Sequence, residues 1–206
     1  SVDDAFKHGL RSVRAVSVSG ACYSFTMHWL SLMYISQQSD RKSTPQERMT
    51  KLRVRGGEAN SLLHNMYQKG RDAGMRLDEA EAPLLLFRGL KRSEPAKIIG
   101  DSTAAAVAMN EIIEDSKPPG IVYSFGYNNP RKKDGNGAHA IGFFYDEEEG
   151  TVNVFDPNYG EFIIKAMGLM TFFAELEETY SQHLRAIIKR LEPDKSSIFW
   201  ALNDHP

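Results

Sequence analysis

Residues 138–158 read AHAIGFFYDEEEGTVNVFDPN, two apolar segments joined by an acidic one. Residues 138–145 and 151–156 are rich in β-branched and aromatic side chains, which are typical of strands. Residues 146–150 between them end in glycine and have the composition of a turn. We therefore predict a β-hairpin at this point, with Tyr145 opposite Gly150.

The predicted hairpin brings a histidine beside an aspartate. In the register that pairs Tyr145 with Gly150, His139 lies directly opposite Asp156, and opposed residues share a face with Cβ atoms about 5 Å apart. A carboxylate at that distance holds an imidazole in one tautomer and stabilises its cation. A half-buried histidine bound to an aspartate that only starts a turn fits the same pattern. The pair alone leaves both interpretations open.

The segments around the hairpin continue the alternating pattern. Residues 121–127 and 159–164 also have a period of two and are separated from the hairpin by turn residues, which predicts an antiparallel meander. Residues 169–184 return to helical spacing, and residues 197–202 add a last strand. The second half of the chain is therefore expected to be rich in strands.

The first half has helical patterns instead. Residues 21–35 are almost continuously apolar and predict a helix that is buried nearly all round, while residues 58–69 and 102–114 predict amphipathic helices. Residues 37–57 are polar and basic, and we expect a solvated loop or a weak helix there. The class of the short apolar run 83–87 is left undecided.

The period of the apolar pattern changes from 3.6 to two near Pro119. This change predicts an α+β fold in which residues 1–206 form a single domain of two lobes. The helical lobe covers about residues 1–118 and the antiparallel sheet lobe covers about residues 119–206, with a cleft between them. The helix that begins near Cys22 then faces the strands that carry His139 and Asp156.

The chain has 206 residues, with 25 basic and 27 acidic side chains and a formal charge of −2. No whole-protein field therefore attracts nucleic acid, and no apolar run approaches the roughly 18 residues of a membrane span. We expect no nucleic-acid partner and no binding of the basic residues 131–133 or 41–55 to a membrane surface. The chain starts at Ser1 without Met and without the apolar segment of a signal peptide, so we expect a fragment, a processed form or a trimmed chain.

The one cysteine of the chain, Cys22, is the candidate nucleophile. It follows Gly20 and Ala21 at the start of the predicted buried helix, where free N–H groups and the helix dipole favour a thiolate. A lone cysteine on an apolar helix is usually core packing. A core cysteine, however, has no reason to lie at a helix N-terminus behind a glycine. The order of Cys22, His139 and Asp156 is that of a thiol nucleophile followed by its base and an orienting carboxylate.

Three blocks of sequence carry a resemblance to a known family: GACYS at 20–24 with Trp29 beyond it, GAHAI at 137–141, and FDPNYGEF at 155–162. In order, spacing and local sequence they resemble the Cys, His and Asp blocks of the YopT/AvrPphB-type cysteine peptidases. The similarity extends from about Gly20 to Tyr180. By this resemblance Cys22 is the nucleophile, His139 the base and Asp156 the orienting residue of a papain-like peptidase.

The resemblance also implies a biological setting. Members of the family are bacterial virulence effectors that are secreted into the host cell cytoplasm, where some cleave prenylated Rho-type GTPases and others cleave host kinases. The resemblance therefore implies a host protein as substrate, with association to a host membrane left open. We expect a monomer without a cofactor. We assign no metal, because His8, His64, His183 and His205 have no second ligand at metal spacing, and we expect His28 to be structural.

One feature departs from the family pattern. Papain-like enzymes place an amide side chain five or six residues before the cysteine to bind the oxyanion, and Ser17 and Val16 occupy these positions here. The expected oxyanion donors are therefore the backbone N–H of Cys22 and the shorter side chain of Ser17. Losing one donor typically costs about 100- to 1000-fold in rate. A glutamine deamidase or transglutaminase-like acyl transferase with the same triad, and a catalytically silent papain-like binding module, remain as alternatives.

Overall fold

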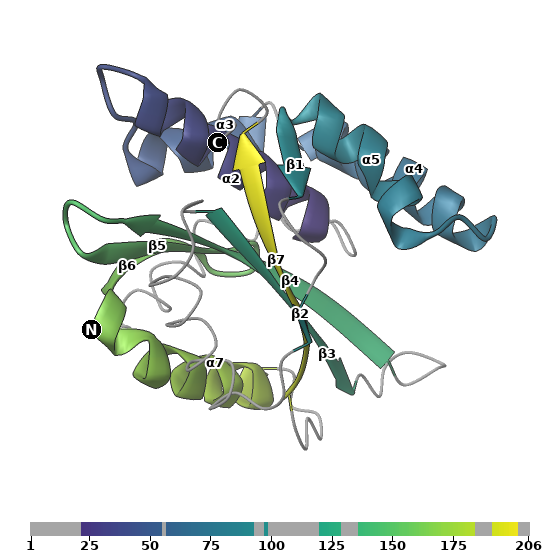
Figure 1. The fold of residues 1–206 in the computed structure, drawn as a ribbon. Helices are drawn as coiled ribbons and strands as arrows, with labels where there is room; N and C mark the ends of the chain where they lie inside the picture. The colour runs from purple at the N-terminus through teal and green to yellow at the C-terminus, as the bar shows by residue number, and fades with distance from the viewer. Residues whose placement is uncertain are drawn as a thin grey trace.

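The computed structural model describes residues 22–54, 57–92, 97–98, 120–128, 136–183 and 191–201, and the fold is given for these residues (Figure 1). The helices come mostly from the first part of the chain. They are α2 (Cys22–Gln38), α3 (Pro45–Val54), α4 (Gly57–Asp72), α5 (Leu77–Phe87) and α7 (Leu169–His183), with a 3₁₀ turn, η1 (Ala166–Gly168), before α7.

The strands form one antiparallel sheet in the order β1-β7-β3-β4-β5-β6, with β2 also paired to β7. Their bounds are β1 (Leu90–Arg92), β2 (Lys97–Ile98), β3 (Gly120–Asn128), β4 (Asn136–Asp146), β5 (Thr151–Asp156), β6 (Gly160–Lys165) and β7 (Leu191–Ala201). The predicted meander is confirmed as β3-β4-β5-β6. The helices together with one antiparallel sheet confirm the predicted α+β class.

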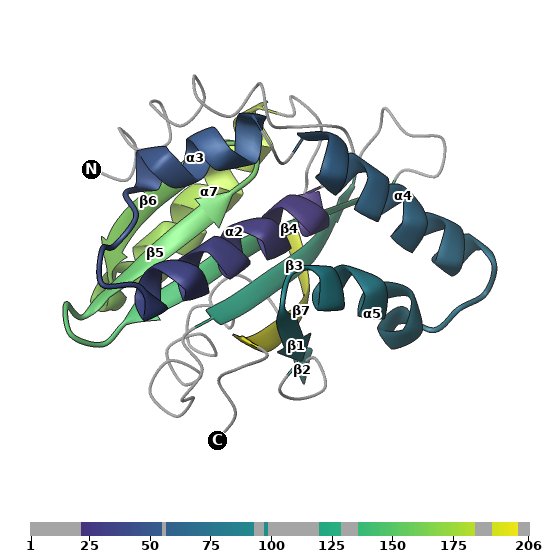
Figure 2. The ribbon, with the colours of Figure 1, turned by 90° about the horizontal axis from the view of Figure 1, so that it is seen from above.

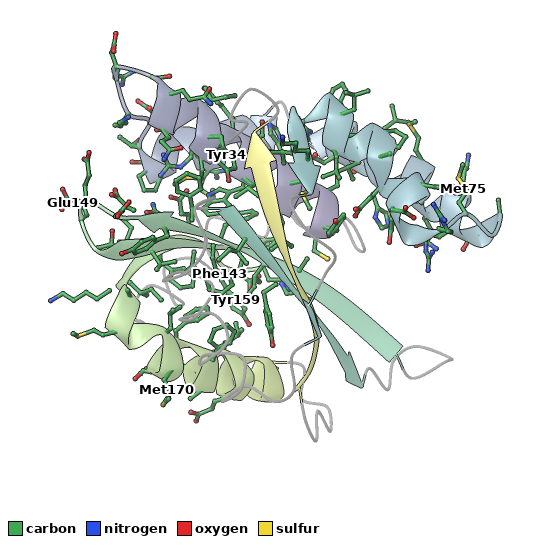
Figure 3. All side chains as sticks on the ribbon, in the orientation of Figure 1. Tyr34, Met75, Phe143, Glu149, Tyr159 and Met170 are labelled. Carbon is green, nitrogen blue, oxygen red and sulfur yellow. The ribbon has the colours of Figure 1, made fainter. Side chains whose placement is uncertain are left out.

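Helices cover both faces of the sheet (Figures 1 and 2). On one face α2 packs against β4 and β5, where Trp29 stacks on Phe155 with ring centroids 5.5 Å apart. On the other face α7 meets Phe143, which stacks on Phe173 at 5.7 Å. Figure 3 shows Tyr34 and Phe143 on opposite sides of the sheet. Successive residues of a strand point to opposite faces, so the apolar hairpin supplies both cores.

The hairpin register differs from the prediction. Strand β4 pairs Asp146 with Thr151 and Tyr145 with Val152, so the predicted pair of Tyr145 with Gly150 is wrong. Gly150 has a φ of 62° and lies in the turn, because this left-handed conformation does not continue a strand. The pairing is shifted by two residues. A shift of two keeps every side chain on its predicted face.

Helix α3 lies inside the segment that we expected to be a solvated loop or a weak helix. Its N-terminus is a capping box, in which the N–H of Glu47 donates to Thr44 Oγ1 at 3.1 Å and the N–H of Thr44 donates to Glu47 Oε2 at 3.2 Å. Pro45 occupies the first helical position, where its fixed φ suits a helix. Local caps therefore establish a helix whose apolar pattern is weak.

Other boundaries were also only partly predicted. The undecided run 83–87 is the end of α5, and Pro83 lies inside that helix. Strands β1 and β2 come before Pro119, in the part of the chain where we expected helices. The helix predicted at 102–114 lies outside the described residues. Within the residues that are described, no helix is long and apolar enough to cross a bilayer.

Candidate active site

Cys22 is the first residue of α2, and its side chain is half-buried. The thiol hydrogen-bonds to the side chain of His139 and to backbone groups of Tyr23 and Ala140. Burial opposes ionisation of the thiol, but the hydrogen bond and charge of His139, together with the two backbone bonds, outweigh it and lower the pKa of Cys22 below its ordinary value. The contacts with His139 and the two backbone groups therefore favour the thiolate form of the sulfur.

His139 and Asp156 meet across the hairpin, although they are not directly opposed. Their contact joins His139 Nε2 and Asp156 Oδ1 at 2.8 Å, and the two residues are 6% and 0% exposed. The pairing of β4 with β5 ends at Gly142 and Phe155. Beyond this last pair lie His139 on β4 and Asp156 on β5. They are diagonal neighbours on one face, a separation that a histidine and an aspartate can bridge.

The turn after β5 fixes the carboxylate of Asp156. Its Oδ1 atom also accepts the backbone N–H of Asn158 at 2.8 Å, and its carbonyl oxygen accepts the N–H of Tyr159 at 2.9 Å. Burial, and then the charge of Asp156, raise the pKa of the Tyr159 phenol above its ordinary value. The sequence Asp156-Pro157-Asn158 thus forms an Asx-type turn that orients the carboxylate toward His139.

The imidazole of His139 lies between two anionic groups. Burial alone would lower its pKa, but the charge and hydrogen bond of Asp156, followed by those of Cys22, raise the pKa of His139 to about 10. Because Nε2 contacts Asp156, Nδ1 is the ring nitrogen that faces the Cys22 thiol. Both pKa shifts favour the state in which His139 carries the proton and the sulfur of Cys22 is a thiolate. Such a pair supplies both a nucleophile and an acid.

Two other predicted features have different outcomes. Ser17, the expected second oxyanion donor, lies outside the described residues. His28 contacts the Asn60 amide at 2.9 Å, and the oxygen of that amide accepts from Ser24 and Arg88, so its nitrogen donates to His28 Nδ1. Burial and the charges of Arg88 and Lys51 lower the pKa of His28 to about 4. The ring is a neutral structural acceptor, as expected. The described residues include no group of three potential metal ligands.

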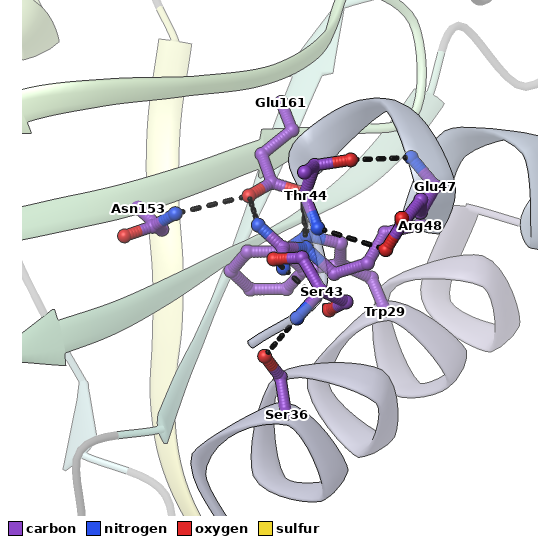
Figure 4. Close-up of polar contacts among 8 residues, drawn as sticks. All are labelled: Trp29, Ser36, Ser43, Thr44, Glu47, Arg48, Asn153 and Glu161. Atoms are coloured by element: carbon purple, nitrogen blue, oxygen red, sulfur yellow. Dashed lines mark hydrogen bonds and ion pairs between the residues drawn. The ribbon is translucent and has the colours of Figure 1, made fainter. Parts of the chain in front are cut away.

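Sequence reasoning missed a buried ion pair beside the hairpin (Figure 4). Arg48 of α3 and Glu161 of β6 have side chains that are 4% and 0% exposed, with Nη2 and Oε1 2.5 Å apart. Glu161 also accepts hydrogen bonds from Trp29 and Asn153. The available signal was a glutamate inside an apolar strand, which is seldom buried unless it is paired. Nothing in the sequence indicated its partner.

The helices and the antiparallel sheet form the α+β fold expected of a papain-like peptidase domain, and α2 brings the thiol of Cys22 to His139 and Asp156. Residues 3–195 match the model of the Peptidase C58 family, described as Yersinia/Haemophilus virulence surface antigen. The chain belongs to this family of YopT/AvrPphB-type cysteine peptidases. The predicted resemblance is thereby confirmed.

Two individual comparisons agree with the family. A candidate YopT-like cysteine protease of Bradyrhizobium diazoefficiens is 27% identical over 180 residues, which cover 85% of this chain and 57% of the relative. The chain thus spans little more than half of the length of that relative. The crystal structure of the Pseudomonas avirulence protein AvrPphB matches with a TM-score of 0.62 and 17% identity, covering 90% of this chain and 95% of that one. At this identity the match establishes the shared fold.

Proposed function

We propose that the protein is a cysteine endopeptidase in which Cys22 is the nucleophile, His139 the acid and base, and Asp156 the residue that orients His139. One observation carries the proposal: the buried His139 ring contacts Asp156 through Nε2 at 2.8 Å and hydrogen-bonds to the Cys22 thiol on its other side. Membership of a cysteine peptidase family supports the same assignment.

The proposed reaction begins with attack of the Cys22 thiolate on the carbonyl carbon of the scissile peptide bond. As the C–N bond breaks, His139 donates its Nδ1 proton to the leaving amine, and a thioester joins the acyl group to Cys22. A water molecule then attacks the thioester and gives a proton to His139. The C–S bond breaks, the carboxylic product leaves and the thiolate is restored. Asp156 stays ionised and holds the ring in position.

The proposed oxyanion donors are the backbone N–H of Cys22 and the side chain of Ser17. The first of these lies at the N-terminus of α2, where the N–H groups are not used by the helix itself and the helix dipole favours negative charge. The charge that develops on the carbonyl oxygen is stabilised there without reorganisation of the site.

The proposed substrate is a host protein, and the family implies a Rho-type GTPase or a kinase. In this proposal the protein is a monomeric virulence effector that a bacterium secretes into the host cell cytoplasm. The description of the matched family as a virulence antigen supports this setting. The named substrate classes rest on the family resemblance of the three sequence blocks.

Intact mass spectrometry of candidate substrates tests the proposal. Prenylated Rho-type GTPases and a panel of host kinases are incubated with the wild type and with Cys22→Ala. A peptidase yields two fragments whose masses sum to the substrate plus one water, and the Cys22→Ala protein yields none. A rise of about one dalton without cleavage would identify a deamidase instead. Cleavage that persists in Cys22→Ala would refute the thiol mechanism.

A further inference from the structure

Helix α2 lies along strand β4 (Figure 2), and several contacts spaced along the helix join the two elements. Cys22 bonds to His139 and Ala140, Thr26 Oγ1 donates to the carbonyl oxygen of Ala140 at 3.1 Å, and Tyr34 packs on Phe144 at 5.1 Å. From Cys22 to Tyr34 the helix rises about 18 Å over about 12 residue steps, and from His139 to Phe144 the strand rises about 17 Å. An axial slip of α2 would therefore separate Cys22 from His139.

Trp29 lies between these contacts and touches three strands at once. Its ring is 0% exposed and stacks on Phe155 of β5. Against β4 it leaves no room at Gly142, where an added Cβ would lie 2.8 Å from the ring atoms Cε3 and Cζ3. Its Nε1–H donates to Glu161 Oε2 of β6 at 2.8 Å. Phe155 directly precedes Asp156 in the chain, so Trp29 connects the helix of the nucleophile to the strand of the orienting carboxylate.

Glu161 is itself held in place (Figure 4). Its Oε2 also accepts from Arg48 Nε at 2.9 Å, and its Oε1 accepts from Arg48 Nη2 at 2.5 Å and from Asn153 Nδ2 at 3.0 Å. Arg48 Nη1 donates in turn to the carbonyl oxygen and the hydroxyl of Ser43. The acceptor of the indole N–H therefore cannot rotate without breaking charge-assisted hydrogen bonds inside the protein.

We propose that Trp29, oriented by Glu161, is a positioning residue that sets the axial position of α2 on the β4–β5 hairpin and so brings the Cys22 thiol to His139. This inference rests on the proposed peptidase function, because it assigns Trp29 a role in assembling that site. A tryptophan that served only to fill the core would affect stability and leave the ionisation of Cys22 unchanged.

Two variants change the contacts of Trp29 in different ways. Trp29→Phe keeps a stacking ring and removes the donor to Glu161, while Gly142→Ala leaves Trp29 intact and places a methyl group against its ring. The matched control is Phe172→Leu, since Phe172 is also 0% exposed but packs in the α7 core on Phe143, Phe162 and Phe173. The readout is the rate of Cys22 alkylation by iodoacetamide as a function of pH, measured beside the Tm of each protein.

We expect both Trp29→Phe and Gly142→Ala to move the alkylation midpoint toward the free thiol value of about 8.5. Once the midpoint lies above pH 6, each further pH unit of movement lowers the rate at pH 6 up to about tenfold. Phe172→Leu should retain the wild-type midpoint at a similar loss of Tm. If one variant does not fold, the other carries the test.

Wild-type midpoints in both Trp29→Phe and Gly142→Ala, with Tm lowered as in the control, would overturn the positioning role alone. A wild-type protein whose own midpoint already equals that of a free thiol would overturn the proposed function, and the positioning role with it. The two failures are therefore distinguishable within one set of measurements.

Discussion

His139 Nε2 lies 2.8 Å from Asp156 Oδ1, which leaves Nδ1 as the ring nitrogen that faces the thiol of Cys22. The same Asp156 oxygen accepts the N–H of Asn158 at 2.8 Å. Two donors therefore converge on one carboxylate oxygen, and both require an acceptor there. This arrangement determines which substitutions of Asp156 preserve the geometry of the histidine and which do not.

Asp156→Asn should impair the enzyme less than Asp156→Ala. The two N–H donors should orient the amide of asparagine with its oxygen toward His139, so that the ring keeps its tautomer while losing its counter-charge. The pKa of His139 should then fall from about 10 toward its ordinary value, and the alkaline limb of the activity profile should move to lower pH. Asp156→Ala loses the acceptor too, and we expect its kcat/KM to fall about 100-fold or more without reaching zero.

Profiles of kcat/KM against pH for the two variants, with circular dichroism as a control for folding, check this prediction. Equal activity of Asp156→Ala and the wild type would show that Asp156 does not orient the histidine.

Cys22→Ser should make the stability of the fold depend more steeply on pH. The pKa of His139 is raised to about 10, so its contribution to stability is complete below the unfolded value near 6.5 and is lost as the pH rises toward 10. The pKa of Cys22 is lowered, so its contribution is complete above the ordinary thiol value and is lost as the pH falls. In the wild type, between pH 6.5 and the ordinary thiol value, the two groups therefore change the free energy of unfolding with pH in opposite directions.

In Cys22→Ser only the histidine contribution remains, because Asp156 still raises the pKa of His139 while serine does not ionise. The free energy of unfolding should then decrease with rising pH above 6.5 by at most about 1.4 kcal/mol per pH unit. Urea unfolding of both proteins at several pH values between 6.5 and 8.5 measures the slopes. Parallel slopes in the two proteins would argue against a thiolate–imidazolium pair.

Glu161→Gln should destabilise the fold by about 3–5 kcal/mol, because it leaves the Arg48 guanidinium buried without its counter-charge. The double variant Arg48→Met/Glu161→Gln should lose less than the sum of the two single changes, with a coupling of about 1 kcal/mol or more. Arg41→Met removes the exposed Arg41–Glu47 pair and is the matched control, with an expected change much smaller than that of Glu161→Gln. Urea unfolding of the four variants and the wild type gives these values, and additive effects would disprove the coupling.

Thr44→Ala should cost about 1 kcal/mol of stability, since Thr44 Oγ1 accepts the N–H of Glu47 and caps α3. Thr50→Ala is the control in the same helix, because Thr50 is exposed and its hydroxyl only donates back to the carbonyl oxygen of Gln46. Its replacement by alanine should be neutral or slightly stabilising. Thermal unfolding of both variants measures the difference, and an equal loss from both would show that the cap contributes nothing specific.

The sequence predicted the elements that rest on local signals. The alternating apolar pattern located the strands of the hairpin, and the apolar run after Gly20 located α2. The capping box from Thr44 to Glu47 is also visible in the sequence as T-P-Q-E, and this local signal marks the start of α3 although the segment is polar.

The remaining features depend on positions that local patterns do not determine. The hairpin register was misjudged by two residues because composition alone does not show that Gly150 takes a positive φ inside the turn. His139 and Asp156 are neighbours despite the wrong register, because a shift by two residues leaves each side chain on its predicted face of the sheet. Arg48 and Glu161 are 113 residues apart, and only the packing of α3 on β6 brings them together.

Iodoacetamide labelling of the wild type and of His139→Ala at pH 6 and pH 9 tests the central claim most directly, because it needs no substrate. If His139 holds Cys22 as a thiolate, the wild type should be alkylated readily at pH 6 and His139→Ala about tenfold more slowly or worse, while the two rates converge at pH 9, where a free thiol with a pKa of about 8.5 ionises unaided. Equal and slow labelling of both proteins at pH 6, with the same rise toward pH 9, would contradict the account and favour a catalytically silent domain.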